Sequence, residues 1–284
     1  MLRWIVIHFH CRQMCFFLHA SIGYLTRKHI LFYTRIGRDM KIFILGCRVL
    51  TRELSALIAQ SQNQVDVTWI PQGLHDTPSL LHDSLNEQLN TLYRQIDRKM
   101  QKRVPDYIVL GYGLCSKAVV GLKAGNIPLV VPKVEDCIGL FLGSQKRYLD
   151  YFSEYKGTFW LNSRWIEDCP DLDEDYDDRL REAYMAQYDD EDTVDYLMEM
   201  HRDGLKNYRN VGYISTNTFD DRSAREQAAR FAADHHLKYL EFVGNNSLLK
   251  KIVDGDFDND SFLIVPPGYQ IRYNNETNSI QAGI

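Results

Sequence analysis

Three cysteines stand just after short apolar runs that predict buried strands: Cys47, Cys115 and Cys137. The runs cover residues 41–45, 107–110 and 127–131. Ligands of open α/β sheets bind outside the carboxyl ends of the strands. If the first four strands lie in the order 2-1-3-4, the strands before these cysteines are neighbours. We therefore expect the three thiols to meet at one edge of the sheet.

Thiolates at one edge would form a site for a soft metal. Cysteine sulfur is a preferred ligand of zinc and of iron–sulfur clusters, and three protein ligands leave one coordination position open. Backbone N–H groups at the strand ends and the Lys133 ammonium are expected to lower the thiol pKa values. We predict a cofactor held by Gly46, Gly111, Gly113 and Lys133 beside these ligands. The competing interpretation is three unrelated buried cysteines that pack as small apolar side chains.

Two further residues are candidates of lower rank. His75 follows the second predicted strand, residues 65–70, and is either a fourth ligand, an acid–base group or an exposed turn histidine. Cys169 lies among acidic residues, which raise a thiol pKa, so we leave it out of the site. The segment 111–116 resembles a dinucleotide fingerprint only weakly and is interpreted as a cradle of backbone N–H groups or as a tight turn.

The elements that must position these residues alternate between strands and helices. Strands are expected at 41–45, 65–70, 107–110, 127–131, 158–161, 211–215, 239–243 and 262–265, with helices between most of them. This alternation predicts an α/β fold with doubly wound parallel sheets. We expect two Rossmann-like lobes facing a cleft, an N-terminal lobe over residues 40–155 and a C-terminal lobe over residues 156–284, which ends in a hairpin.

Composition excludes several classes. The 284 residues are 45% hydrophobic with a net charge of −5, so the chain can bury a core and has no basic field for nucleic acid. Six cysteines are too few for a disulfide scaffold, and no apolar run is long enough for a membrane helix. We expect no nucleic acid, no membrane and a cytoplasmic location.

Residues 1–39 differ from the rest of the chain. They carry a net charge of +5, which leaves −10 on the other 245 residues, and they follow no helical or strand period. A signal peptide and a His–Cys metal site are both weaker interpretations, since the apolar core of the segment is short and its His and Cys residues follow no pattern. We interpret the segment as a start-site artefact or a disordered leader, with Met40 as the natural start.

Several long motifs resemble the domain of unknown function 1638 family. They are LGCRVLTREL (45–54), PQGLHDTP (71–78), LGYGLCSKAVVGL (110–122), VPKVEDCIGLFLGS (131–144) and FWLNSRWIE (159–167). The resemblance covers most of residues 40–270 and places the family-type cysteines at Cys47, Cys115 and Cys137. Ser116 and the Ser163-Arg164 step depart from the family pattern. The family occurs in anaerobes and methanogens near corrinoid-dependent methyltransferases, which implies an accessory role in one-carbon metabolism.

The leading hypothesis is a protein with a three-cysteine metal or iron–sulfur site in an interlobe cleft. A small-molecule ligand or substrate is expected there, and the resemblance implies a corrinoid protein or a methyltransferase as partner. Whether the protein is an enzyme stays open, because a lyase, a reductive activation and a methyl transfer all suit such a site. The alternatives are a non-catalytic module that binds a corrinoid-type small molecule, with structural cysteines, and an interaction protein.

Overall fold

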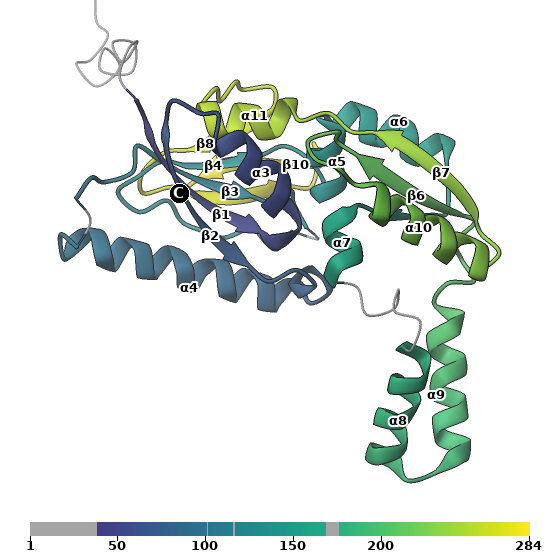
Figure 1. Cartoon of the computed structure of the whole chain (residues 1–284). Coiled ribbons are helices and arrows are strands. Elements are labelled where there is room, and N and C mark those ends of the chain that lie inside the picture. The colour runs from purple at the N-terminus through teal and green to yellow at the C-terminus, as the bar shows by residue number, and fades with distance from the viewer. Residues whose placement is uncertain (1–38, 101, 116, 169–175) are drawn as a thin grey trace, which may run out of the picture. The chain divides into compact units, whose positions relative to one another are not determined.

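The computed structural model describes residues 39–100, 102–115, 117–168 and 176–284 (Figure 1). The strands are β1 (Lys41–Cys47), β2 (Gln64–Ile70), β3 (Tyr107–Gly111), β4 (Leu129–Pro132), β5 (Thr158–Leu161), β6 (Asn210–Ser215), β7 (Lys238–Val243), β8 (Phe262–Val265), β9 (Gln270–Asn274) and β10 (Ser279–Gly283). The helices are η1 (Arg48–Leu50), α3 (Thr51–Ile58), η2 (Leu74–Asp76), α4 (Pro78–Asp97), α5 (Cys137–Leu142), α6 (Gln145–Glu154), α7 (Ser163–Asp168), α8 (Tyr176–Tyr188), α9 (Glu191–Asp203), α10 (Arg222–Asp234) and α11 (Ser247–Asp254). The predictions for the leader and for Cys169 fall outside the described residues.

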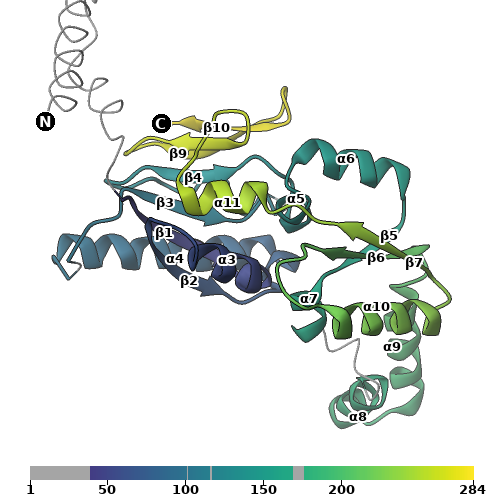
Figure 2. The same cartoon turned by 45° about the horizontal axis from the view of Figure 1, so that its top comes forward.

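The first sheet has the strand order β2-β1-β3-β4-β8. Its first four strands are parallel, and most apolar residues of β1, β3 and β4 are almost fully buried because helices cover both faces, whereas those of the edge strand β2 are mostly half-buried. Helix α4 runs along one face, and α3 and α11 lie on the other (Figures 1 and 2). The predicted α/β class and the strand order 2-1-3-4 are confirmed. The carboxyl ends of β1, β3 and β4 therefore lie side by side.

Strand β8 corrects the expected topology. The sequence placed residues 262–265 in a parallel sheet of the C-terminal lobe, but Ile264 pairs with Val130 and β8 runs antiparallel to β4. Phe262 and Val265 are buried there, because β8 covers the edge that β4 would otherwise expose. The expected hairpin follows as β9 and β10. The last part of the chain thus returns to the first sheet.

The second sheet has the order β5-β6-β7, and all its strands are parallel. Helices α6 and α10 lie on opposite faces of it (Figures 1 and 2). Beyond α7 the chain forms two helices with a break between them, α8 and α9, which are joined by ion pairs of Arg181 with Asp195 and Glu191. The break follows from Asp190, whose carboxylate accepts the Thr193 N–H at the start of α9. None of the described helices is long and apolar enough to cross a membrane.

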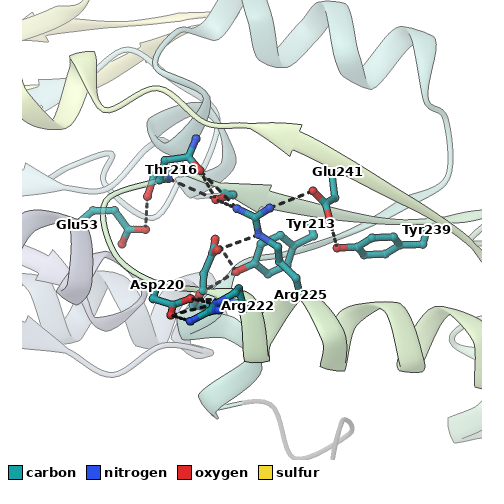
Figure 3. Close-up of polar contacts among 12 residues, drawn as sticks. Glu53, Tyr213, Thr216, Asp220, Arg222, Arg225, Tyr239 and Glu241 are labelled. Carbon is teal, nitrogen blue, oxygen red and sulfur yellow. Dashed lines mark hydrogen bonds and ion pairs between the residues drawn. The ribbon is translucent and has the colours of Figure 1, made fainter.

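A polar cluster fixes α7 against the second sheet (Figure 3). The Tyr213 hydroxyl of β6 lies 2.8 Å from the Ser163 hydroxyl at the start of α7 and donates to Asp221 at 3.2 Å. Arg225 of α10 binds the other oxygen of Asp221 at 2.8 Å and reaches Glu241 of β7. Because α7 carries a tryptophan of the site described below, this cluster sets the position of one of its walls.

Glu53 of α3 connects the first sheet to the second (Figure 3). The side chain is buried, and one carboxyl oxygen accepts a hydrogen bond from the Thr216 hydroxyl, in the loop after β6, at 3.0 Å. The second oxygen, Oε2, is buried and has no hydrogen-bond partner among the described residues. Burial raises the pKa of Glu53 to about 7, so near neutral pH the carboxyl holds its proton in about half of the folded molecules.

Glu53→Gln should make the protein more stable above neutral pH. The raised pKa means that the folded state holds the Glu53 proton more tightly than the unfolded state does. The protonated carboxyl therefore makes its full contribution to the free energy of unfolding below about pH 4.5, and this contribution is lost as the pH rises through about 7. We expect the variant and the natural protein to match in acid and to differ by up to roughly 3 kcal/mol at pH 8. Urea unfolding across this range measures the difference. The exposed Glu87→Gln is the control, and a pH-independent difference for the Glu53 variant would contradict the prediction.

Candidate functional site

A cavity of about 410 Å³ lies at the carboxyl ends of β1, β3 and β4. All three strand-end cysteines line it, together with residues that come from both sheets. The walls are Cys47, Val49, Pro71, Leu74, His75, Leu81, Gly111, Tyr112, Cys115, Glu135, Asp136, Cys137, Ile138, Tyr148, Trp160 and Trp165. The volume is that of a site for a small molecule.

Backbone pairing joins the two loops that carry Cys115 and Cys137. The Leu114 N–H donates to the Val134 carbonyl, and the Cys115 N–H donates to the Glu135 carbonyl, both at 2.8 Å. Gly113 permits this approach, because a Cβ there would lie 2.6 Å from the Asp136 nitrogen. A side chain at position 113 would therefore force the two loops apart.

Asp136 fixes the position of Cys137. Its carboxylate accepts the N–H groups of Ile138 and Gly139, so Asp136 is the N-cap of α5 and Cys137 is the first residue of that helix. The Tyr148 hydroxyl of α6 donates to the other carboxylate oxygen at 3.2 Å. The helix-capping geometry thus holds the Cys137 side chain at the cavity wall.

Cys115 has a strained backbone. Its φ is +43°, in the left-handed region that costs a non-glycine residue energy. The backbone hydrogen bond to Glu135 and the loop packing hold this conformation, and the side chain lines the cavity. Strain of this kind gathers at functional sites, where the surrounding structure imposes it.

Burial keeps all three thiols protonated at neutral pH. It raises the pKa of Cys115 to about 12 and that of Cys137 well above the ordinary value, and the Asp136 charge raises both further. The pKa of Cys47 is raised by the same cause. The expectation that strand-end N–H groups and Lys133 lower these pKa values is wrong, because desolvation outweighs the hydrogen bonds.

Each thiol nevertheless has a hydrogen bond that favours its thiolate. A backbone hydrogen bond from Val49 lowers the pKa of Cys47, and one from Gly113 lowers that of Cys115. A side-chain hydrogen bond from Trp165 lowers the pKa of Cys137. Donors to sulfur of this kind surround the thiolate ligands of metal centres and clusters, where they tune the bound metal.

Tyr112 directs a buried hydroxyl at the same space. It lacks a hydrogen bond of normal geometry among the described residues. It lies close enough to Cys47 to lower that thiol's pKa, so this contact is at most a weak interaction with sulfur. Burial and the charges of Cys47 and Cys115 raise the pKa of Tyr112, so the hydroxyl keeps its proton as a donor. A buried donor of this kind implies an acceptor in the cavity.

The charges around the cavity suit a cation. Glu135 and Asp136 line it with the three thiols, and no lysine or arginine belongs to its described walls. His75 is half-buried in the wall, with its ring edge-on to Trp165 at 5.4 Å, and its charge lowers the pKa of Asp136. Among the described wall residues, His75 is thus the side chain that can place positive charge beside the thiols.

Comparison with protein families finds a match over residues 69–253 to the family described as "Protein of unknown function (DUF1638)". The chain belongs to this family. The match includes Cys115, Cys137 and His75 and begins after Cys47. Neither the curated proteins nor the solved structures include a match to the DUF1638 chain.

The predicted glycines and Lys133 have different positions in the DUF1638 structure. Gly111 lines the cavity, and Gly113 lies where the two loops meet. Gly46 makes room for the Trp69 ring, since a Cβ there would lie 3.0 Å from it, and it does not line the cavity. Lys133 donates to the Asn259 carbonyl at 2.5 Å and also lies outside the walls.

Sequence reasoning missed the aromatic wall and the role of Asp136. Trp160 and Trp165 belong to the second sheet and α7, so no local pattern connects them to the cysteines. Asp136 was readable, because an aspartate directly before an apolar hexapeptide is an N-cap signal. Among the described residues, no group of three or more His, Cys, Asp or Glu side chains is arranged to hold a metal ion.

The three thiols of the cavity should react slowly with an alkylating reagent at neutral pH. Because the pKa of Cys115 is about 12, its alkylation by iodoacetamide should accelerate about tenfold per pH unit between about pH 7 and pH 10. Mass spectrometry of the peptides resolves each cysteine, and urea-unfolded protein is the control. A rate that levels off below pH 9 would contradict the burial of this thiol.

Tyr112→Phe should stabilise the ligand-free protein. The change removes a buried hydroxyl that lacks a normal partner, so the free energy of unfolding is expected to rise by roughly 1 kcal/mol. Tyr148→Phe is the matched control, since that hydroxyl donates to Asp136 and its loss should destabilise by roughly the same amount. Chemical denaturation measures both, and equal losses of stability would refute the argument.

Proposed function

We propose that Cys47, Cys115 and Cys137 ligate a metal centre that binds a small molecule at an open coordination position. The observation that carries the proposal is that all three strand-end cysteines line one cavity whose described walls contain no lysine or arginine. Three thiols and two carboxyl groups stand there without a lysine or arginine among the described walls, and a bound cation would add positive charge beside them. It would also lower the thiol pKa values and convert the thiols to ligands.

The donor set fits such a group. Thiolates are soft ligands, each thiol has a hydrogen-bond donor, and the Tyr112 hydroxyl is buried without a normal partner. Cys47, Cys115 and Cys137 would hold the metal, and Tyr112 would donate to a thiolate, a sulfide or the small-molecule ligand. His75 is the candidate for the fourth position or for moving a proton to a bound ligand, because it stands in the same wall.

An iron–sulfur cluster is favoured over a single zinc ion. One tetrahedral zinc needs sulfur atoms roughly 3.8 Å apart, given Zn–S bonds of about 2.3 Å. A cluster joins cysteines that are further apart, and the described residues contain no compact group of metal ligands. When bound, a cluster held by three cysteines supplies an iron with an open position and the capacity to transfer an electron.

We further propose that the two parallel sheets are Rossmann-like lobes and that the cavity opens in a cleft between them. Trp160 of β5 and Trp165 of α7 line it opposite residues of the first sheet, which supports this arrangement. The cytoplasmic location, the accessory role in corrinoid or one-carbon metabolism and the partner, a corrinoid protein or a methyltransferase, stay predictions from the family resemblance.

The alternative is a non-catalytic module for a corrinoid-type or other small molecule, with structural cysteines. One observation favours it: the thiols are neutral, and Tyr112, Tyr148, Trp160 and Trp165 give the cavity aromatic walls. Aromatic walls with a few polar groups are typical of sites for organic ligands.

Anaerobic purification with iron, zinc and acid-labile sulfide analysis tests the proposal. Iron and sulfide with a visible charge-transfer band are expected. Changing Cys47, Cys115 or Cys137 to Ser should each lower metal content at least about tenfold. Zinc without sulfide would support a zinc site, whereas full metal content in all three variants would refute the ligand assignment.

Unfolding of the same variants in metal-free form is the control. Each should melt within a few degrees of the metal-free natural protein, because a serine replaces a neutral thiol of similar size. Absence of metal in the natural protein, together with binding of an organic ligand, would favour the alternative.

A further inference from the structure

A second cavity, of about 370 Å³, is basic. Its walls are Arg48, Thr51, Arg52, Trp69, Arg164 and Glu167. They come from η1, α3, the end of β2 and α7. Three guanidinium groups face this space with one carboxylate, the reverse of the charge in the thiol cavity.

Two guanidinium groups of this wall pair with its single carboxylate, and the third has no carboxylate partner there. Glu167 accepts from Arg52 and, at 2.7 Å, from Arg164, whose other nitrogen binds Asp168 at 2.7 Å. Arg48 forms no ion pair within the described part of the chain, and the Arg164 Nε is buried there without a hydrogen-bond partner. The pocket therefore holds unused N–H donors and an excess of positive charge.

Two of the three guanidinium groups of this pocket, those of Arg52 and Arg164, are already held in place. Arg52 lies over the Phe219 ring at 5.1 Å from its centre, and only 15% of the Arg164 side chain is exposed. Trp69 packs against Gly46 and forms an apolar wall. Because these side chains are ordered by the fold, a ligand would not have to order them on binding.

We propose that this basic pocket binds the phosphate group of a small molecule. Planar guanidinium groups donate two hydrogen bonds at once to a phosphate or carboxylate, and a phosphate group offers three acceptor oxygens to the unused N–H donors. The volume leaves room for an organic part against Trp69. This site is distinct from the proposed metal centre, because the two cavities have no wall residue in common.

Titration calorimetry with inorganic phosphate at constant ionic strength tests the proposal, with succinate as the carboxylate probe. Saturable phosphate binding is expected in the natural protein. Arg48→Gln should weaken it at least about tenfold, because the free guanidinium is lost. Arg98→Gln removes an equal charge at an exposed position of the chain and should leave binding unchanged.

Three outcomes would overturn the proposal. The first is that phosphate gives no saturable binding heat, and the second is that the Arg98 variant weakens phosphate binding as much as the Arg48 variant does. The third is that succinate saturates the protein and phosphate does not, which would make a carboxylate the ligand of the pocket. Metal content of the Arg48 variant separates the two sites: if it is unchanged while phosphate binding is lost, the basic pocket acts independently of the metal centre.

Discussion

The site depends on the close backbone contact between the loop after β3 and the loop after β4. Two hydrogen bonds, from the N–H groups of Leu114 and Cys115, join these loops, and the missing side chain of Gly113 makes room for them. This contact holds Cys115 in its strained conformation and places Asp136 to cap α5. Without it, neither thiol would have a fixed direction, and the parallel sheet alone would leave both on free loops.

The sequence was sufficient to predict how the cysteines meet, because their placement depends on local signals and on one topological rule. Apolar runs gave the strands before Cys47, Cys115 and Cys137, and parallel order brings strand ends to one edge. The antiparallel pairing of β8 was not predictable, since a four-residue apolar strand carries no mark of its direction or partner. The raised thiol pKa values were missed because they come from burial in the folded protein, which outweighs the local hydrogen bonds that lower them.

The short segment between β1 and α3 separates two opposite electrostatic environments. Cys47 and Val49 line the thiol cavity, and Arg48, between them in the sequence, lines the basic pocket. In α7, Arg164 lines the basic pocket and the next residue, Trp165, lines the thiol cavity. In both segments, residues adjacent in the sequence line cavities of opposite charge, because successive side chains leave the backbone in different directions.

The return of β8 to the first sheet has a consequence for synthesis on the ribosome. Strand β4 leaves the exit tunnel long before Phe262 does, so its outer edge has no partner while the whole second sheet is being made. An unpaired apolar edge can recruit strands of other chains. The nascent chain would therefore need a chaperone or fast folding of the β5-β6-β7 sheet to shield it. Truncation before residue 262 would make that exposed edge permanent and favour aggregation.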